Sequence, residues 1–157
     1  MVKNKNKVEM KTIIIFGATG GIGVYTALHL SNSNEYRIIA VGHRKNDNGF
    51  FAQYGIEYLS VDIADFKTFN VLPSEGVDAV VNLAGVLPAR SYDPRMYIQS
   101  FTMGQLNVLE YMNKVGCKKI ISAQTPADLW YLQNTTDPMP ADAQRSFPPS
   151  TDHSIYT

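Results

Sequence analysis

The chain has 157 residues, of which 45% are hydrophobic and 18% charged, as expected for one globular domain. Fourteen basic residues balance fourteen acidic ones, so no net charge favours binding to nucleic acid or to an anionic membrane. Cys117 is the single cysteine, which excludes an intrachain disulfide, and the three histidines are too scattered to predict a metal site. No run approaches the ~20 apolar residues of a membrane span. We therefore expect a cytoplasmic protein without membrane or nucleic-acid partners.

The pattern along the chain predicts alternating strands and helices. Residues 1–11 carry four lysines among polar residues and predict a flexible leader, followed by one domain over residues 12–157. Predicted strands cover residues 12–16, 37–42, 56–61, 77–83 and 118–122. Predicted helices cover residues 21–30, 49–54, 65–72 and 94–115. Because apolar strands alternate with helices, we expect an α/β fold with a doubly wound parallel sheet in the order 3-2-1-4-5.

The most informative segment joins the first strand to the first helix. It reads Thr-Ile-Ile-Ile-Phe-Gly-Ala-Thr-Gly-Gly-Ile-Gly over residues 12–23. Such a strand, glycine turn and helix let the backbone approach a dinucleotide pyrophosphate, which the helix N-terminus then attracts. The alternative is a glycine turn without a ligand, but the flanking elements favour a Rossmann dinucleotide site. Its predicted cofactor-binding residues are Gly17, Thr19, Gly20, Gly21, Ile22 and Gly23.

The ends of the next two strands predict the adenosine side of this site. Asp62 and Ile63 follow the third strand, where a carboxylate and a backbone N–H can bind adenine; the alternative is a helix cap or loop carboxylate. The second strand ends at His43 and Arg44 with no acid to bind the ribose hydroxyls. A guanidinium pairs well with a 2′-phosphate, so NADP is favoured over NAD. The alternative is that this is only the solvated start of a loop.

The fourth strand ends in the small residues Ala84 and Gly85, after Leu83. They would let the backbone lie against the cofactor ribose at the point where the strand order reverses. Further along, Asp93 and Pro94 are a good N-cap and first residue for the long helix, which should end at Gly116.

Together these segments resemble the N-terminal part of the extended short-chain dehydrogenase/reductases, in particular the NAD(P)-dependent epimerase/dehydratase family, which acts largely on nucleotide sugars. The resemblance covers residues 12 to about 122. It rests on the glycine turn, Asp62-Ile63, Asn82-Leu83-Ala84-Gly85, the stretch Gly-Gln-Leu-Asn-Val-Leu-Glu at 104–110, and residues 115–122.

The resemblance implies a catalytic serine or threonine and a Tyr-x-x-x-Lys motif, in which the lysine charge lowers the tyrosine pKa and the tyrosine acts as base. Tyr156 matches the tyrosine best, but the lysine would fall at position 160, past Thr157. Thr125 fits the serine or threonine best and Ser122 next. Phe101 occupies a position where the family often has asparagine. The alternative for Tyr156 is a residue without a role.

The sequence thus predicts the NAD(P)-binding portion of a nucleotide-sugar epimerase/dehydratase-type oxidoreductase, truncated before the rest of its catalytic and substrate region. We expect this chain to be catalytically inactive by itself. The alternative is a non-catalytic dinucleotide-sensing or scaffold protein of the same superfamily. The helix over residues 94–115 is a candidate homodimer interface, as it commonly is in the family.

Overall fold

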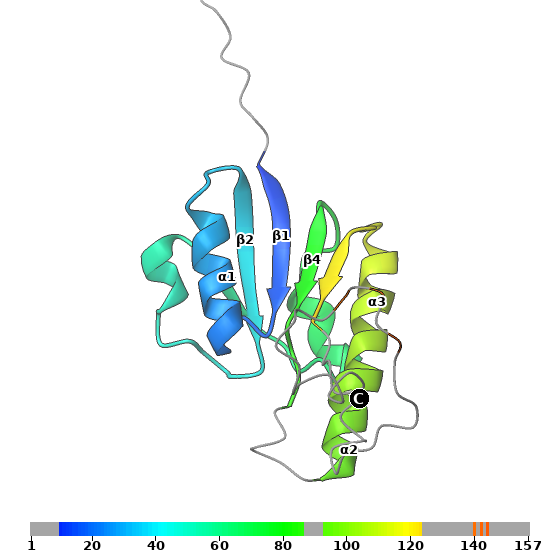
Figure 1. The fold of residues 1–157 in the computed structure, drawn as a ribbon. Helices are drawn as coiled ribbons and strands as arrows, with labels where there is room; N and C mark the ends of the chain where they lie inside the picture. The colour runs from blue at the N-terminus through cyan, green and yellow to red at the C-terminus, as the bar shows by residue number, and fades with distance from the viewer. Residues whose placement is uncertain (1–9, 87–92, 124–139, 141, 143, 145–157) are drawn as a thin grey trace, which may run out of the picture.

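The computed structural model describes residues 10–86, 93–123, 140, 142 and 144. In these residues, five parallel strands form one sheet (Figure 1). They are β1 (Lys11–Phe16), β2 (Tyr36–Gly42), β3 (Glu57–Ser60), β4 (Ala79–Asn82) and β5 (Ile120–Ser122). The spatial order β3-β2-β1-β4-β5 confirms the predicted topology. Lys11, predicted to lie in the leader, is instead the first residue of β1 and is paired with Tyr36.

The helices between the strands differ in type from the prediction. Helix α1 (Gly21–Ser31) follows the glycine turn as predicted, whereas η1 (Phe51–Tyr54) and η2 (Phe66–Val71) are 3-10 helices. Strands β3, β4 and β5 are each shorter than their predicted ranges. The type of these two helices and the length of these three strands differ from the prediction for the same reason. Apolar runs show which segments are buried, but they do not determine which backbone hydrogen bonds a segment makes or where these begin and end.

Alternating side chains of the strands build two cores, one on each face of the sheet. On the first face, Ile13 and Ile15 of β1 pack with Ala27 of α1 and Phe51 of η1. On the second face, residues of the same strands pack against η2 and α3. This larger cluster contains Ile14, Phe16, Ile39, Val41, Val61, Phe69, Leu72, Val77, Val80, Val108, Tyr111, Met112 and Cys117. A doubly wound sheet requires buried side chains on both faces, and this chain supplies them.

The predicted long helix is present but is divided into three parts (Figure 1). It consists of α2 (Pro94–Tyr97), one turn of π-helix η3 (Ile98–Met103) and α3 (Gly104–Lys114). Its start is the expected one, because Asp93 Oδ1 accepts a hydrogen bond of 2.9 Å from the backbone N–H of Arg95. Gly116 ends it with a φ of +73°. The π-helical turn was not predicted, since a helical apolar pattern does not reveal a single widened turn.

Among the residues that the structure describes, no helix is both long enough and apolar enough to cross a membrane.

Candidate cofactor site

The glycine turn is held at the carboxyl ends of β1 and β4 by direct backbone packing. Gly17 has a φ of +75°, which favours glycine, and an added Cβ would lie 2.6 Å from Ala84 N. A Cβ on Gly23 would lie 2.7 Å from Ala18 Cα and would also clash with Gly17 O. Both glycines therefore allow β1, β4 and α1 to approach more closely than any side chain would permit.

Gly20 and Gly21, unlike Gly17 and Gly23, have free space where a side chain would be. An added Cβ on Gly20 would meet only Gly17 O, at 3.3 Å, and one on Gly21 would meet nothing within 4 Å. Gly20 is the N-cap of α1 and supplies no side-chain hydrogen bond, and the first turn of the helix contains no acidic residue. The N-terminus of α1, which includes the exposed Ile22, is thus open and keeps the positive end of its dipole.

The end of β2 lies directly beside this turn. The half-buried Thr19 packs on Gly42, where an added Cβ would lie 2.9 Å from Thr19 Cγ2. His43 and Arg44 follow and are exposed, and the Tyr58 hydroxyl donates a 2.7 Å hydrogen bond to Arg44 O. Burial raises the pKa of Tyr58, the charge of Asp47 raises it further, and the charge of Arg44 lowers it. The Arg44 backbone is therefore fixed while its side chain is exposed.

The loop after β3 is fastened from two sides. The backbone N–H of Asp62 donates to Thr68 Oγ1 at 3.1 Å, and Asn107 Nδ2 of α3 donates to Ile63 O at 2.7 Å. Asp62 Oδ1 accepts from Ala64 N at 2.9 Å, so this carboxylate does have a loop-stabilising role. Asp62 is an exposed residue, and its Oδ2 has no partner among the described residues. The adenine role predicted for Asp62 and Ile63 stays a prediction, with one carboxylate oxygen available for it.

A hydrogen bond between the buried Asn82 and the half-buried Gln105 joins the carboxyl end of β4 to α3, and Gln105 reaches β5 as well. Asn82 Nδ2 donates to Gln105 Oε1 at 2.6 Å, and Asn82 Oδ1 accepts from Ala84 N at 3.2 Å. The Ser122 hydroxyl donates to the same Gln105 oxygen at 3.2 Å. Ser122, a predicted catalytic residue, therefore lies at the end of β5 in register with Asn82. The other two, Thr125 and Tyr156, lie outside the described residues.

Three further residues shape this edge and were given no role from the sequence. Asn107 holds the loop after β3, and Gln105 joins β4 to β5. Phe101 lies on Gly85, where an added Cβ would be 2.8 Å from the ring Cζ and closer still to Cε1. In the sequence, Gln105 and Asn107 appeared only within the stretch 104–110 that carries the family resemblance, and Phe101 gave no signal beyond its departure from the family pattern.

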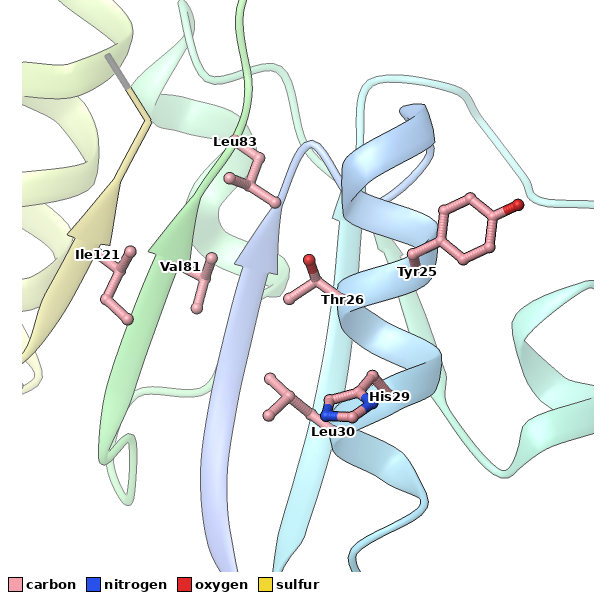
Figure 2. A pocket seen from close by; sticks show the side chains of 7 residues that line it. All are labelled: Tyr25, Thr26, His29, Leu30, Val81, Leu83 and Ile121. Atoms are coloured by element: carbon pink, nitrogen blue, oxygen red, sulfur yellow. The ribbon is translucent and has the colours of Figure 1, made fainter. Parts of the chain in front are cut away.

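A separate hollow of about 610 Å³ lies beside α1, on the face of the sheet that carries this helix (Figure 2). It is lined by Tyr25, Thr26, His29, Leu30, Val81, Leu83 and Ile121. Figure 2 shows that these side chains come from α1, from β4 and the residue that follows it, and from β5, rather than from the glycine turn. Their mainly apolar character suits the packing of apolar groups and not the binding of phosphates, so we do not assign the cofactor to this hollow.

Comparisons with known proteins find related sequences and related folds. Residues 13–156 match the NAD dependent epimerase/dehydratase family. The UDP-glucose 4-epimerase of Lacticaseibacillus casei is 30% identical over 123 residues, which are 74% of this chain and 36% of that protein. UDP-glucose 4-epimerase 2 of Oryza sativa subsp. japonica is 26% identical over 134 residues, covering 75% of this chain and 32% of that protein. The chain therefore spans about a third of the length of these relatives.

Solved structures share the fold at lower identity. The ADP-L-glycero-D-manno-heptose-6-epimerase of Helicobacter pylori aligns with a TM-score of 0.74 and 19% identity, covering 99% of this chain and 50% of that one. The fold, the glycine turn between β1 and α1, and the family match over nearly the whole chain lead to one conclusion. The chain belongs to the NAD dependent epimerase/dehydratase family.

Proposed function

We propose that this chain binds NAD(P) across the carboxyl edge of the sheet, with the pyrophosphate against the glycine turn. The observation that carries the proposal is the open N-terminus of α1. Gly20 has no side chain there, the first helical turn has no acid, and Gly17 and Gly23 fix the turn by close backbone packing. Backbone N–H groups and the helix dipole then favour a dianionic pyrophosphate.

The strand order suggests where each half of the cofactor would lie. A dinucleotide crosses a doubly wound sheet at the point where the strand order reverses, which here lies between β1 and β4. We assign adenine to the Asp62–Ile63 loop beside β3 and the nicotinamide half to Ala84 and Gly85 after β4. Two observations support the adenine assignment. The hydrogen bond from Asn107 of α3 to Ile63 O fixes the loop in place. Asp62 uses Oδ1 for a bond within the loop, so Oδ2 has no partner among the described residues.

For the choice of cofactor we propose NADP over NAD. His43 and Arg44 are exposed at the end of β2, beside the glycine turn, where the adenosine ribose would lie. The nearby acid Asp47 is engaged, since its two oxygens accept from Gly49 N at 3.1 Å and Phe51 N at 2.7 Å. The Arg44 guanidinium is thus the group best placed to pair with a 2′-phosphate.

We further propose that a protein containing this chain acts on a nucleotide sugar, as the names of its epimerase relatives suggest. When bound, the nicotinamide supplies a hydride carrier. From this chain, Ser122 or Thr125 would bind the substrate hydroxyl and Tyr156 would move its proton. Because the chain spans only about a third of those relatives, we assign the rest of the substrate site to the part of their length that it does not span.

A second candidate is a dinucleotide-sensing or scaffold protein without chemistry, with the cytoplasm as its expected location in either case. The observation that favours it is Phe101, an apolar ring against Gly85 where the family often has an asparagine. Both candidates predict that this chain binds the cofactor, and only the enzyme predicts turnover, by a longer protein that contains this chain.

We also propose a homodimer through the helix over residues 94–115. Ile98 at the start of η3, and Leu106 and Leu109, which lie three residues apart on α3, are 51%, 54% and 44% exposed. Such a stripe is typical of an interface. Leu106→Glu should place a charge in the centre of the stripe and convert a dimer to a monomer in sedimentation experiments, whereas Glu35→Gln, at the opposite end of the sheet, should not.

The test of the main proposal is calorimetric titration of the chain with NAD⁺, NADP⁺ and ADP, followed by incubation with UDP-glucose and UDP-galactose. We expect heat of binding with the dinucleotides, and tighter binding of NADP⁺. Absence of binding by all three would refute the proposed function. In a longer protein that includes this chain and turns over a nucleotide sugar, Tyr156→Phe should remove most of that turnover; retained activity would exclude the tyrosine.

A further inference from the structure

The π-helical turn η3 contains one contact with the cofactor edge of the sheet and is followed directly by a second. After it, Gly104 is buried against the loop that follows β3, where an added Cβ would lie 2.6 Å from Ile63 Cδ1. Within it, the Phe101 ring lies on Gly85, where an added Cβ would be 2.8 Å from Cζ. A π-helical turn contains one residue more than an α-helical turn, so it shifts the side chains on its two sides relative to each other. Single π turns inside α-helices occur frequently at functional sites.

The Phe101 ring is held in place rather than free to rotate into solvent. It is nearly parallel to the ring of Tyr97, with an angle of 6° and 6.3 Å between centroids. Tyr97 is buried, with 4% of its surface exposed, whereas Phe101 is 37% exposed. The Phe101 ring therefore packs against Tyr97 and Gly85, while part of the residue stays exposed.

The position of Gly85 identifies which part of a dinucleotide would meet this ring. Gly85 follows Ala84, and the Leu83–Ala84 backbone touches Gly17 of the glycine turn. With adenine on the β3 side of that turn, the other half of the cofactor must extend toward β4. Phe101, whose ring lies against Gly85, therefore stands on the side of the turn where the ribose and nicotinamide would lie, and not on the adenosine side.

We propose that Phe101 is a positioning residue for the nicotinamide half of the cofactor. This inference rests on the proposed binding of NAD(P). The ring forms an apolar wall beside Gly85, packs against the nicotinamide ribose and excludes water from it. A phenyl ring has no hydrogen-bonding group, so it acts by packing alone. The ring thereby sets the affinity for the complete dinucleotide while leaving the affinity for its adenosine half unchanged.

The experiment compares complete and half cofactors on three proteins. Calorimetric dissociation constants are measured for NADP⁺ and NAD⁺, and for 2′,5′-ADP and ADP as the halves that lack nicotinamide. The variants are Phe101→Asn and, as a matched control in the same π turn, Met103→Asn, because Met103 is 44% exposed and is not among the nearest neighbours of Gly85. We expect Phe101→Asn to weaken the complete dinucleotides by about 3- to 10-fold, as for the loss of an aromatic contact. Affinity for the halves should stay within twofold, and the control should change neither.

Substitution of Gly85 tests the same contact from the other side, first with the Phe101 ring present and then with the ring removed. Gly85→Ala adds a Cβ that must displace the Phe101 ring, so it should weaken the complete dinucleotides selectively. In a Phe101→Ala background the same change should have a smaller effect, because the clash with the ring is gone and only the direct approach of Gly85 to the cofactor remains. Circular dichroism establishes that each variant is folded.

The outcomes separate the two proposals. If the unaltered chain binds neither dinucleotides nor halves, the proposed function fails and this inference with it. If it binds them and Phe101→Asn leaves all affinities unchanged, only the role of Phe101 is refuted. Equal weakening of complete dinucleotides and halves would also refute it, since the ring would then act on the fold of the whole edge.

Discussion

The glycine turn allows binding and folding to be separated by two substitutions three residues apart. Gly20 is exposed and extended, with φ −81° and ψ 166°, a conformation that valine adopts readily. In Gly20→Val the new Cβ meets only Gly17 O at 3.3 Å. The tight contact costs little, and the loss of backbone freedom in the unfolded chain offsets it by roughly 0.4–1 kcal/mol. We expect the free energy of unfolding to change by less than about 1 kcal/mol.

Gly23→Ala should have the reverse effect. Its Cβ would lie 2.7 Å from Ala18 Cα, about 0.7 Å inside the 3.4 Å at which ordinary contact begins, and would also clash with Gly17 O. These atoms belong to the backbone and cannot rotate away. Overpacking of this kind costs typically ~1–3 kcal/mol. Urea denaturation should therefore show a clear loss of stability for Gly23→Ala and almost none for Gly20→Val.

The two variants differ again in binding. The branched valine side chain would stand where the pyrophosphate approaches the α1 N-terminus, and each hydrogen bond to a charged group contributes about 1.5–3 kcal/mol. Loss of one or two such bonds predicts at least ~10- to 100-fold weaker binding of NADP⁺ by Gly20→Val in calorimetry. Glu35→Val, at the opposite edge of the sheet, is the control and should bind normally. A folded Gly20→Val protein with unchanged affinity would show that the turn is only structural.

Three further predictions concern the rest of the edge and the core. Arg44→Asp should reverse the preference for NADP⁺ over NAD⁺, by about one to two decades in the ratio of dissociation constants; an unchanged ratio would refute the assigned 2′-phosphate contact. Asn107→Ala removes a buried hydrogen bond to Ile63 O, so it should lower the free energy of unfolding by about 1–3 kcal/mol and weaken ADP binding; unaltered ADP affinity would argue against adenine at this loop. Burial raises the pKa of Tyr111 to about 12, so the folded state holds this proton more tightly than the unfolded state, and stability should fall as the pH rises from about 10 toward 12. Tyr111→Phe loses a 2.7 Å hydrogen bond to Pro73 O, so its free energy of unfolding at neutral pH should be lower. In urea denaturation, that free energy should fall less between pH about 10 and 12 than in the unaltered chain; an equal fall would contradict this.

The sequence by itself determined the topology and the place of the turn. Runs such as Ile13 to Phe16 are apolar on both sides, which only a sheet covered on both faces can bury, and the spacing of Gly17, Gly20 and Gly23 has a local cause in backbone conformation and close packing. The N-cap at Asp93 was likewise readable, because the cap is a contact between near neighbours in the chain.

Tertiary structure alone decided the features that join distant segments. The contact of Phe101 with Gly85, the hydrogen bond from Asn107 to Ile63 O and the shared oxygen of Gln105 each link residues on different elements. The π-helical turn belongs with them, because Phe101 within it and Gly104 directly after it both contact other segments. Such contacts depend on how closely two elements approach in space, to within a fraction of an ångström. The hydrophobic periodicity of one segment does not determine that distance.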